Sequence, residues 1–172
     1  MGDAISESQY RTAKGDIAIR HQSDQAACEA MAGNAKDVCN AESNGRESVA
    51  KAELEQAYAP SLTHDYDVHI AKAAANYAIA NEKCDESAGN VQDVCRKEAK
   101  SAEAVARADA ELMQKSAAAN TGANEANGAA ARKAAMEKRD AAYAVAKEKC
   151  DSLADAAQAS CIADAKKAHG QS

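Results

Sequence analysis

The fold of this chain is decided by the stretch between residues 84 and 95, which reads Cys84-Asp85-Glu86-Ser87-Ala88-Gly89-Asn90-Val91-Gln92-Asp93-Val94-Cys95. A continuous helix through this stretch would hold its two cysteines about 16 Å apart, too far for them to bond to each other. The Gly-Asn step between them predicts a chain reversal instead, which brings both cysteines to similar heights on antiparallel helices. Two further cysteine pairs have the same spacing. We therefore expect three disulfide-closed helical hairpins, with the pairs Cys28–Cys39, Cys84–Cys95 and Cys150–Cys161.

The residues between the cysteines have the chemistry of a helix end followed by a helix start. Gly89 suits the left-handed position that ends a helix, and Asn90 suits the N-cap of the next helix. Asp93 follows three residues later, as in a capping box. The third stretch has no glycine, so we expect a less well-defined turn there, capped by Asp155 and Gln158. The full set of expected turn and cap residues is Gly33, Asn34, Asp37, Gly89, Asn90, Asp93, Asp155 and Gln158.

An internal repeat extends beyond the cysteines. A shift of 56 residues aligns Cys28 with Cys84 and Tyr10 with Tyr66, and a third, truncated copy follows. His21 takes the position that tyrosine holds in the other two copies, which favours an interface role over a catalytic one. We expect one helical repeat domain over residues 1–172, divided into repeat 1 (about 4–59), repeat 2 (about 60–119), a linker (about 119–129) and repeat 3 (about 130–169).

The expected fold class is all-α, with about six helices. Three disulfide-tipped antiparallel hairpins would form an up-and-down bundle or an elongated antiparallel coiled-coil array. A helix running through Pro60 is the alternative, at a cost of about 3 kcal/mol. A heptad-like apolar seam is predicted at Val91, Val94, Val105, Ala108 and Leu112. The expected helices are 4–31, 35–58, 62–87, 91–118, 130–153 and 156–168.

Composition limits both the core and the range of functions. Alanine makes up about a quarter of the 172 residues, and there is no Phe or Trp, so stability must come from helix propensity, sparse seams and disulfides. The net charge of −6, with acids and bases interspersed, argues against nucleic acid as a partner. No apolar run reaches the roughly 18 residues that would span a bilayer.

The cysteine pairs also indicate a compartment. Disulfides persist in oxidising environments, so we expect a periplasmic or secreted protein. The N-terminus, Met1-Gly2-Asp3-Ala4, lacks the charged and apolar regions of a signal peptide. We interpret the chain as a mature exported protein from which such a peptide has been removed.

Catalytic chemistry is not indicated. The Cys-x₁₀-Cys spacing matches neither a redox motif nor a zinc knuckle, and no nucleophile motif or phosphate loop is present. We expect no enzyme activity and no cofactor. The segment from His64 to His69 is the one cluster of potential metal ligands, with His64, Asp65 and His69 as candidates. The preferred interpretation of this cluster is an acidic helix start with solvated histidines.

The segments Tyr77-Ala78-Ile79-Ala80-Asn81-Glu82-Lys83-Cys84-Asp85 and Ala88 to Lys100 resemble Ala/Lys/Glu-rich exported proteins of Gram-negative bacteria that are often labelled TolA-like. Most of these proteins have no characterised function. The membrane anchor and globular end of TolA itself have no counterpart here, so a role in the Tol system does not carry over. The resemblance implies a periplasmic location and an envelope- or stress-related role.

The functional hypothesis that follows is a non-catalytic periplasmic scaffold or protein-interaction module. It would bind a protein partner or associate with itself. The alternative is a periplasmic carrier of a ligand or metal ion, using a groove between hairpins or the segment from His64 to His69. Calorimetry with metal ions, on wild type and on His69→Ala, would distinguish the metal carrier from the scaffold.

Overall fold

The computed structural model describes the backbone of residues 4–119 and 124–171, and the side chains of residues 119–127 are not described. The described chain is all-α, as the sequence predicts. Its helices are α1 (Glu7–Glu29), α2 (Asn34–Tyr58), α3 (Leu62–Lys83), the short 3₁₀ helix η1 (Cys84–Glu86), α4 (Gly89–Ala119), α5 (Asn124–Cys150) and α6 (Asp155–Ala168).

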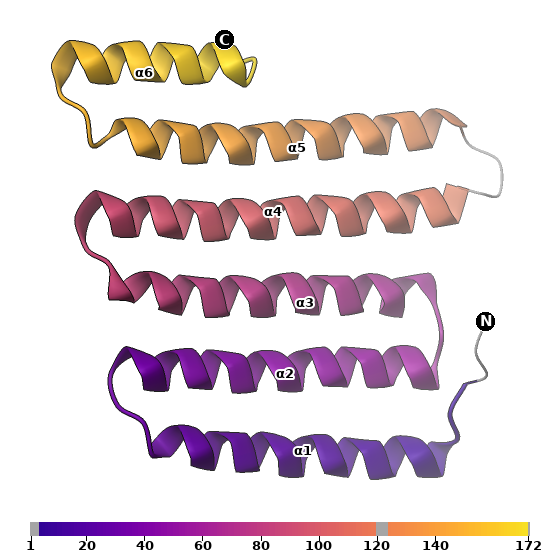
Figure 1. Ribbon diagram of the computed structural model, residues 1–172. Coiled ribbons are helices and arrows are strands. Elements are labelled where there is room, and N and C mark those ends of the chain that lie inside the picture. The colour runs from indigo at the N-terminus through magenta and orange to yellow at the C-terminus, as the bar shows by residue number, and fades with distance from the viewer. Residues whose placement is uncertain (1–3, 120–123, 172) are drawn as a thin grey trace.

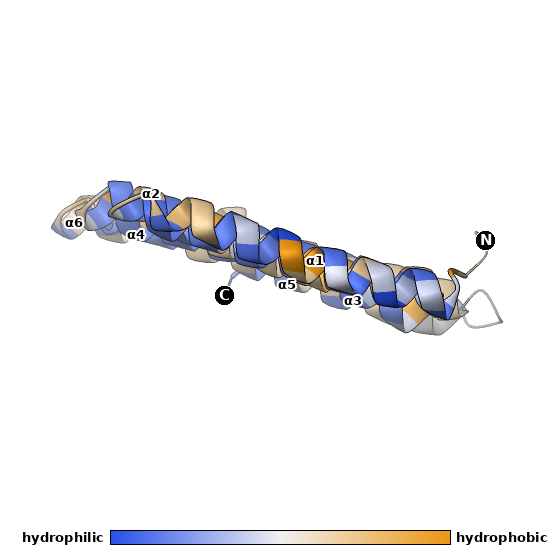
Figure 2. Cartoon of the chain, turned by 90° about the horizontal axis from the view of Figure 1, so that it is seen from below, coloured by the Kyte–Doolittle hydropathy of each residue, from blue (hydrophilic) through white to orange (hydrophobic). Residues whose placement is uncertain are grey.

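The helices lie side by side in chain order, from α1 at one edge to α6 at the other (Figure 1). Turned by 90°, the same helices form one thin layer (Figure 2). Within the described residues, extensive packing joins only helices that follow one another in the chain. The arrangement is therefore an open up-and-down layer with two exposed faces, and each interior helix has neighbours on two opposite sides.

The three predicted disulfides are present and close the three hairpins. Their Cα–Cα distances are 5.5, 5.6 and 5.7 Å, within the usual range for a disulfide. The first cysteine of each pair is buried. All three bridges lie at the same end of the layer, where α1 meets α2, α3 meets α4, and α5 meets α6 (Figure 1).

The third turn also has a residue with positive φ, although it lacks a glycine. Gly33 and Gly89 have φ of 59° and 58°, and Asp155 has φ of 44° at the corresponding position. The predicted capping role of Asp155 and Gln158 is therefore wrong. Ala154 is the N-cap residue of α6 and makes no side-chain cap, because its methyl group cannot accept a hydrogen bond, and Asp155 follows it as the first residue of α6. Asp tolerates a positive φ better than most non-glycine residues.

Asn34 and Asn90 are not N-caps either. Asn34 is the first residue of α2, and Gly33 before it makes no side-chain cap hydrogen bond, so Asp37 forms no capping box there. Asn34 instead donates from Nδ2 to the backbone oxygen of Glu82, at 2.6 Å. Asn90, within the first turn of α4, donates to the backbone oxygen of Glu148, at 3.1 Å. Asp93 lies one turn into α4. Each asparagine thus joins its own turn to the next hairpin.

One further polar contact recurs in all three turns. The residue after the first cysteine bonds to a side chain early in the next helix in every hairpin. These contacts are Lys36 to Glu29 (2.8 Å), Gln92 to Asp85 (2.9 Å) and Gln158 to Asp151 (2.9 Å). Gln158 therefore bridges its turn instead of capping α6.

The two junctions between hairpins use the same contacts at corresponding positions. Three contacts join α2 to α3: Lys72 with Glu53, Lys83 with Glu42, and Asn34 with the Glu82 oxygen. Three corresponding contacts join α4 to α5: Lys138 with Asp109, Lys149 with Glu98, and Asn90 with the Glu148 oxygen. This second junction also has the ion pairs of Lys97 with Glu148 and Lys133 with Glu111. A shift of 56 residues in the acidic helix and 66 in the basic helix maps one set onto the other. These junctions set the hairpins next to each other in one layer.

Replacing either junction asparagine should loosen the array without unfolding it. We expect Asn34→Ala and Asn90→Ala each to lower the free energy of unfolding by about 1 kcal/mol, because each removes one inter-hairpin hydrogen bond. Urea denaturation followed by circular dichroism measures the change. The control is Ala156→Asn, which places asparagine at the corresponding position of α6, where the described chain has no further hairpin. If Ala156→Asn raised the free energy of unfolding by as much as Asn34→Ala or Asn90→Ala lowers it, the role of these asparagines in joining hairpins would be contradicted.

The core consists of narrow seams between helices. In α4, Ala108 and Ala110 are both buried. Residues two apart in a helix point in nearly opposite directions, so α4 is buried on two opposite sides. The predicted heptad seam is wrong at Val91, which lies at the start of α4 and is 67 % exposed. The closest approach between helices is at Gly45 in α2, where an added Cβ would lie 2.9 Å from the Cβ of Ala75 in α3.

The predicted break at Pro60 is confirmed, whereas several helix ends differ from the prediction. Helix α1 starts at Glu7, not at residue 4, because Ser6 and Gln9 form a capping box. No helix runs through Pro60: α2 ends at Tyr58, and Ser61 caps α3 by accepting from the His64 backbone N–H. Helix α5 begins at Asn124, so residues 124–129 of the expected linker are helical, and residues 120–123 lie outside the described residues.

Candidate functional site

A groove of about 600 Å³ lies over α1, α2 and α3. Helix α1 contributes Ile17, Arg20, His21 and Asp24; α2 contributes Glu42, Ser43, Gly45, Arg46, Glu47, Val49, Ala50 and Glu53; and α3 contributes Ala75, Asn76 and Ile79. The close approach of α2 and α3 at Gly45 and Ala75 forms its floor. A second groove, of about 470 Å³, lies on the opposite side of the same seam and includes Asn44, Ser48 and Ala74.

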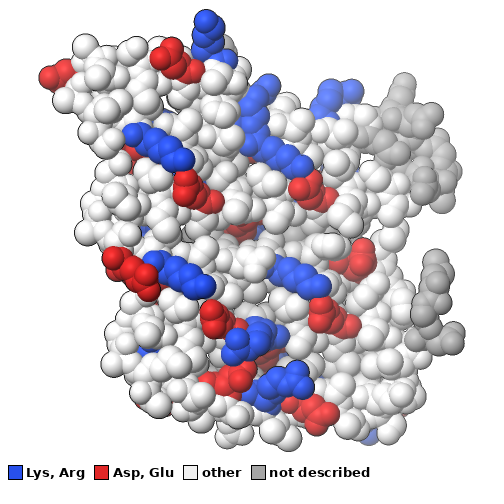
Figure 3. Space-filling view, in the orientation of Figure 1, with Lys and Arg blue, Asp and Glu red and all other residues white. Residues whose placement is uncertain are grey.

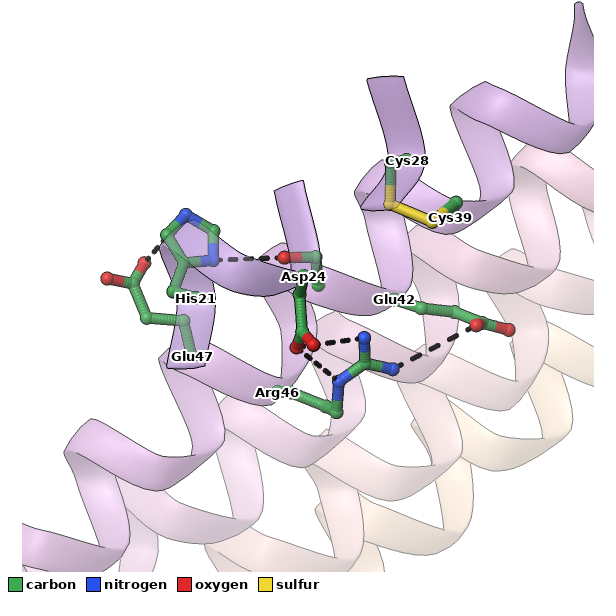
Figure 4. A network of polar contacts seen from close by, with 8 residues as sticks. His21, Asp24, Cys28, Cys39, Glu42, Arg46 and Glu47 are labelled. Carbon is green, nitrogen blue, oxygen red and sulfur yellow. Dashed lines mark hydrogen bonds and ion pairs between the residues drawn. A yellow bond between two sulfur atoms is a disulfide. The ribbon is translucent and has the colours of Figure 1, made fainter. Parts of the chain in front are cut away.

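His21 joins α1 to α2 inside the larger groove (Figure 4). Its Nδ1 lies 3.0 Å from Ser43 Oγ, and its Nε2 lies 3.7 Å from a carboxylate oxygen of Glu47. The three side chains come from the seam between the two helices, where Ser43 is completely buried. A hydroxyl buried between helices needs a hydrogen-bond partner, and His21 supplies it.

Serine, histidine and glutamate side chains lie together here, as in a catalytic triad. Their geometry does not support nucleophilic catalysis. The exposed fraction of Ser43 is 0 %, so no substrate carbonyl reaches its Oγ. The residue lies in the middle of α2, where the backbone N–H groups are used in the helix and cannot form an oxyanion hole. The network therefore holds α1 against α2.

A second network beside it consists of ion pairs around Arg46. Its guanidinium lies 3.0 Å from Asp24 of α1 and 3.9 Å from Glu42 of α2 (Figure 4). Arg46 is about half exposed, so these pairs are screened by solvent and contribute little to stability individually. They do fix the polar rim of the groove close to the Cys28–Cys39 bridge.

The corresponding part of the second hairpin uses different chemistry. Tyr77 takes the place of His21, and the buried Ala99 takes the place of Ser43. The ammonium group of Lys100 lies 4.8 Å above the Tyr77 ring, a cation–π contact. The sequence alignment identified His21 as an interface residue but missed Ser43. The signal in the sequence was that both positions differ between the repeats: the second hairpin has tyrosine and alanine where the first has histidine and serine.

Two glutamates beside these seams are held ionised. A hydrogen bond from Lys51 lowers the pKa of Glu47, against the opposing effect of burial. Burial alone would raise the pKa of Glu103, which is 6 % exposed, but hydrogen bonds from Lys100 and Arg107 outweigh it and lower the pKa below 4.5. Both carboxylates therefore act as fixed negative charges at neutral pH, not as proton carriers.

Glu103→Gln should change how stability depends on acid. Because the pKa of Glu103 is lower in the folded chain, its ionised form stabilises the fold above about pH 4.5, and this stabilisation is lost as the pH falls through the lowered value. We expect the variant to lose about 1 kcal/mol at pH 7 and to show a flatter decline below pH 4.5. Urea denaturation at a series of pH values measures both. Parallel curves for variant and wild type would contradict this role.

The candidate metal ligands do not form a metal site. Among the described residues, no group of three or more histidine, cysteine, aspartate or glutamate side chains is arranged to hold a metal ion. His64 and His69 are five positions apart on α3 and point in different directions. The ring of His64 lies 2.6 Å from the backbone oxygen of Ala59, so it packs on the turn before α3. The proposed ligand set of His64, Asp65 and His69 is therefore wrong.

The charged surface is mixed. Figure 3 shows lysine and arginine interspersed with aspartate and glutamate on the face in view, with neither sign gathered into a patch. Many of these charges are paired between helices, as in the junctions described above. None of the described helices is both long and apolar enough to cross a membrane.

Fold and site together define an all-α protein of three disulfide-closed hairpins arranged as one open layer, with grooves along the seam between α2 and α3. No protein-family model, curated protein or solved structure matches this chain.

Proposed function

We propose that this protein is a non-catalytic helical scaffold that binds a protein partner across a face of its layer. The observation that carries the proposal is the single layer itself. A closed bundle turns its apolar stripes inward, whereas here the seam of α2 and α3 is reached from both faces through the two grooves. The larger groove combines apolar walls at Ile17 and Ile79 with a rim of ion pairs, the combination found in protein interfaces.

The location that we propose is the periplasm of a Gram-negative bacterium. The three disulfides fit an exported protein, since such bonds persist in oxidising compartments. The resemblance to TolA-like exported proteins supports the more specific assignment and an envelope- or stress-related role. The absence of a usable nucleophile at Ser43 supports a role other than catalysis.

Site-specific photo-cross-linking in cells tests the proposal. A photoreactive amino acid at Asn76, which is exposed at the larger groove, should give a discrete cross-linked protein after irradiation. The matched control is Ser48, which is exposed at the smaller groove on the opposite face. We expect Asn76 to capture the partner and Ser48 not to capture it. Equal capture of many proteins at both positions, or no capture at Asn76, would contradict the proposal.

A small-molecule carrier is the second candidate, favoured by the volume of the larger groove. Ligand sites usually have about 300–1,000 Å³, and this groove lies within that range. The fluorescent probe 8-anilinonaphthalene-1-sulfonate distinguishes the two candidates. A saturable signal that Ile79→Arg abolishes would support the carrier, whereas a scaffold should give only weak fluorescence that the substitution does not change.

A further inference from the structure

The outer side of α1 is an edge of the layer. Helix α1 packs on α2 along one side, and no other described helix packs extensively on it. Ile19 lies on the outer side and is 68 % exposed, more than any other large apolar side chain in the described residues. Gly15 lies one turn before it, and a Cβ added there would meet nothing within 4 Å. The centre of this edge is therefore an accessible apolar residue beside open space.

The register of the hairpins shows what this edge corresponds to. Counted from the first cysteine of each hairpin, Ile19 takes the place of Ala75 and Ala141. Ala75 is the residue of α3 that meets Gly45 of the preceding hairpin. The outer side of α1 thus corresponds to the side by which α3 and α5 pack on the preceding hairpin. In α1 this side has no described hairpin beside it and lies at the edge of the layer.

Another hairpin of the same kind does not fit this edge. The two junctions depend on lysines at 72 and 83 and at 138 and 149, but α1 has Asp16 and Ala27 at the corresponding positions. On the opposite edge, α6 has Ala156 where the junction asparagine would be. Head-to-tail stacking of copies would therefore lack both ion pairs and the asparagine hydrogen bond.

We propose that the outer side of α1 binds α1 of a second copy of this chain, antiparallel and about a two-fold axis near Ile19. Asp16 and Arg20 lie one helical turn apart and have no ion-pair partner among the described residues. Antiparallel pairing places Asp16 of each copy beside Arg20 of the other, because the two residues flank the axis on one side of the helix. Ile19 packs against its counterpart, and Gly15 allows the backbones to approach closely.

A two-fold contact of this kind closes on itself. It joins two layers edge to edge. Of the residues in the contact, Arg20 also lies on the rim of the larger groove, whereas Ile19 and Gly15 do not line it. The pairing goes beyond the proposed scaffold function and does not depend on it, because Ile19 at its centre does not line the larger groove and Ile19→Lys leaves that groove unchanged. Loss of the dimer and loss of partner capture at Asn76 are therefore separate results.

Sedimentation equilibrium of the full, oxidised chain over a range of concentrations tests the dimer. We expect a reversible dimer in the wild type and a dissociation constant raised about tenfold or more by Ile19→Lys, which would place a charge at the centre of the contact. Val91→Lys is the matched control, because Val91 is 67 % exposed but lies at the start of α4, in another hairpin. It should leave the dissociation constant unchanged.

Charge exchange tests the orientation of the pair. Asp16→Arg and Arg20→Asp should each weaken the dimer, and the double variant should restore it, because opposite charges then face each other again. A wild type that stays monomeric at every concentration would overturn the proposal. So would equal effects of Ile19→Lys and Val91→Lys, or a double variant that is weaker than both single variants.

Discussion

Reduction of the three disulfides should unfold this protein at room temperature. Each bridge closes a short loop, and the chain-entropy account gives about 3 kcal/mol for a loop of this size. Three such contributions are comparable to the whole stability of a typical domain, which is about 5–15 kcal/mol. The alanine-rich seams bury few large side chains that could offset the loss. Far-UV circular dichroism during titration with a thiol-free reductant measures the effect.

Removal of a single bridge measures the contribution of one hairpin's disulfide to the stability of the chain. We expect Cys84→Ala/Cys95→Ala to lower the free energy of unfolding by about 3 kcal/mol while leaving the other two bridges and most of the helix content intact. A fully reduced chain that keeps its native circular dichroism and its urea midpoint would show that the helices hold together without the disulfides. That result would contradict the stabilising role given to the bridges here.

Gly45→Ala should destabilise the chain even though alanine is the better helix former. The added Cβ would lie 2.9 Å from the Cβ of Ala75, so α2 and α3 must separate along the seam that joins the first two hairpins. We expect a loss of about 1–3 kcal/mol, the usual range for overpacking, after the gain in helix propensity of up to about 1 kcal/mol. Urea denaturation of the dilute protein measures the difference.

Two further variants serve as controls for this contact. Gly15→Ala has open space around its new Cβ and should raise stability by about 0.5–1 kcal/mol through helix propensity alone. Gly45→Ala/Ala75→Gly exchanges the two residues across the seam and should recover most of the loss. If Gly45→Ala and Gly15→Ala stabilise the chain equally, the close approach of α2 and α3 is wrong.

The hairpins were predictable because their signals are local. A cysteine pair around a Gly-Asn step fixes both the reversal and the bridge. Gly33 and Gly89 have positive φ, but they stand at the start of α2 and α4, so their predicted role in ending the preceding helix is wrong. The third turn was harder to interpret, since Asp155 adopts the same φ without being a glycine. The asparagines were assigned to the wrong partner because a cap and an inter-hairpin hydrogen bond use the same residue type.

The single layer was not predictable from periodicity. An interior helix such as α4 has one narrow stripe on each of two opposite sides, as Ala108 and Ala110 show, so no single apolar face stands out. Val91 matched the heptad but lies exposed at the start of its helix. The candidate site was only partly predictable: His21 stood out as a replacement for tyrosine, whereas Ser43 becomes visible only when α1 and α2 are placed side by side.

Peptide mapping of the unreduced chain tests the central claim, that each cysteine pair closes its own hairpin. Trypsin has no cleavage site between Cys84 and Cys95 or between Cys150 and Cys161, so each pair should appear within one peptide, residues 84–96 and 150–166. Each peptide should be lighter than its reduced form by the two hydrogens lost on oxidation. Peptides 21–36 and 37–46 should be found joined through Cys28 and Cys39. Any disulfide between these three groups would contradict the fold described here.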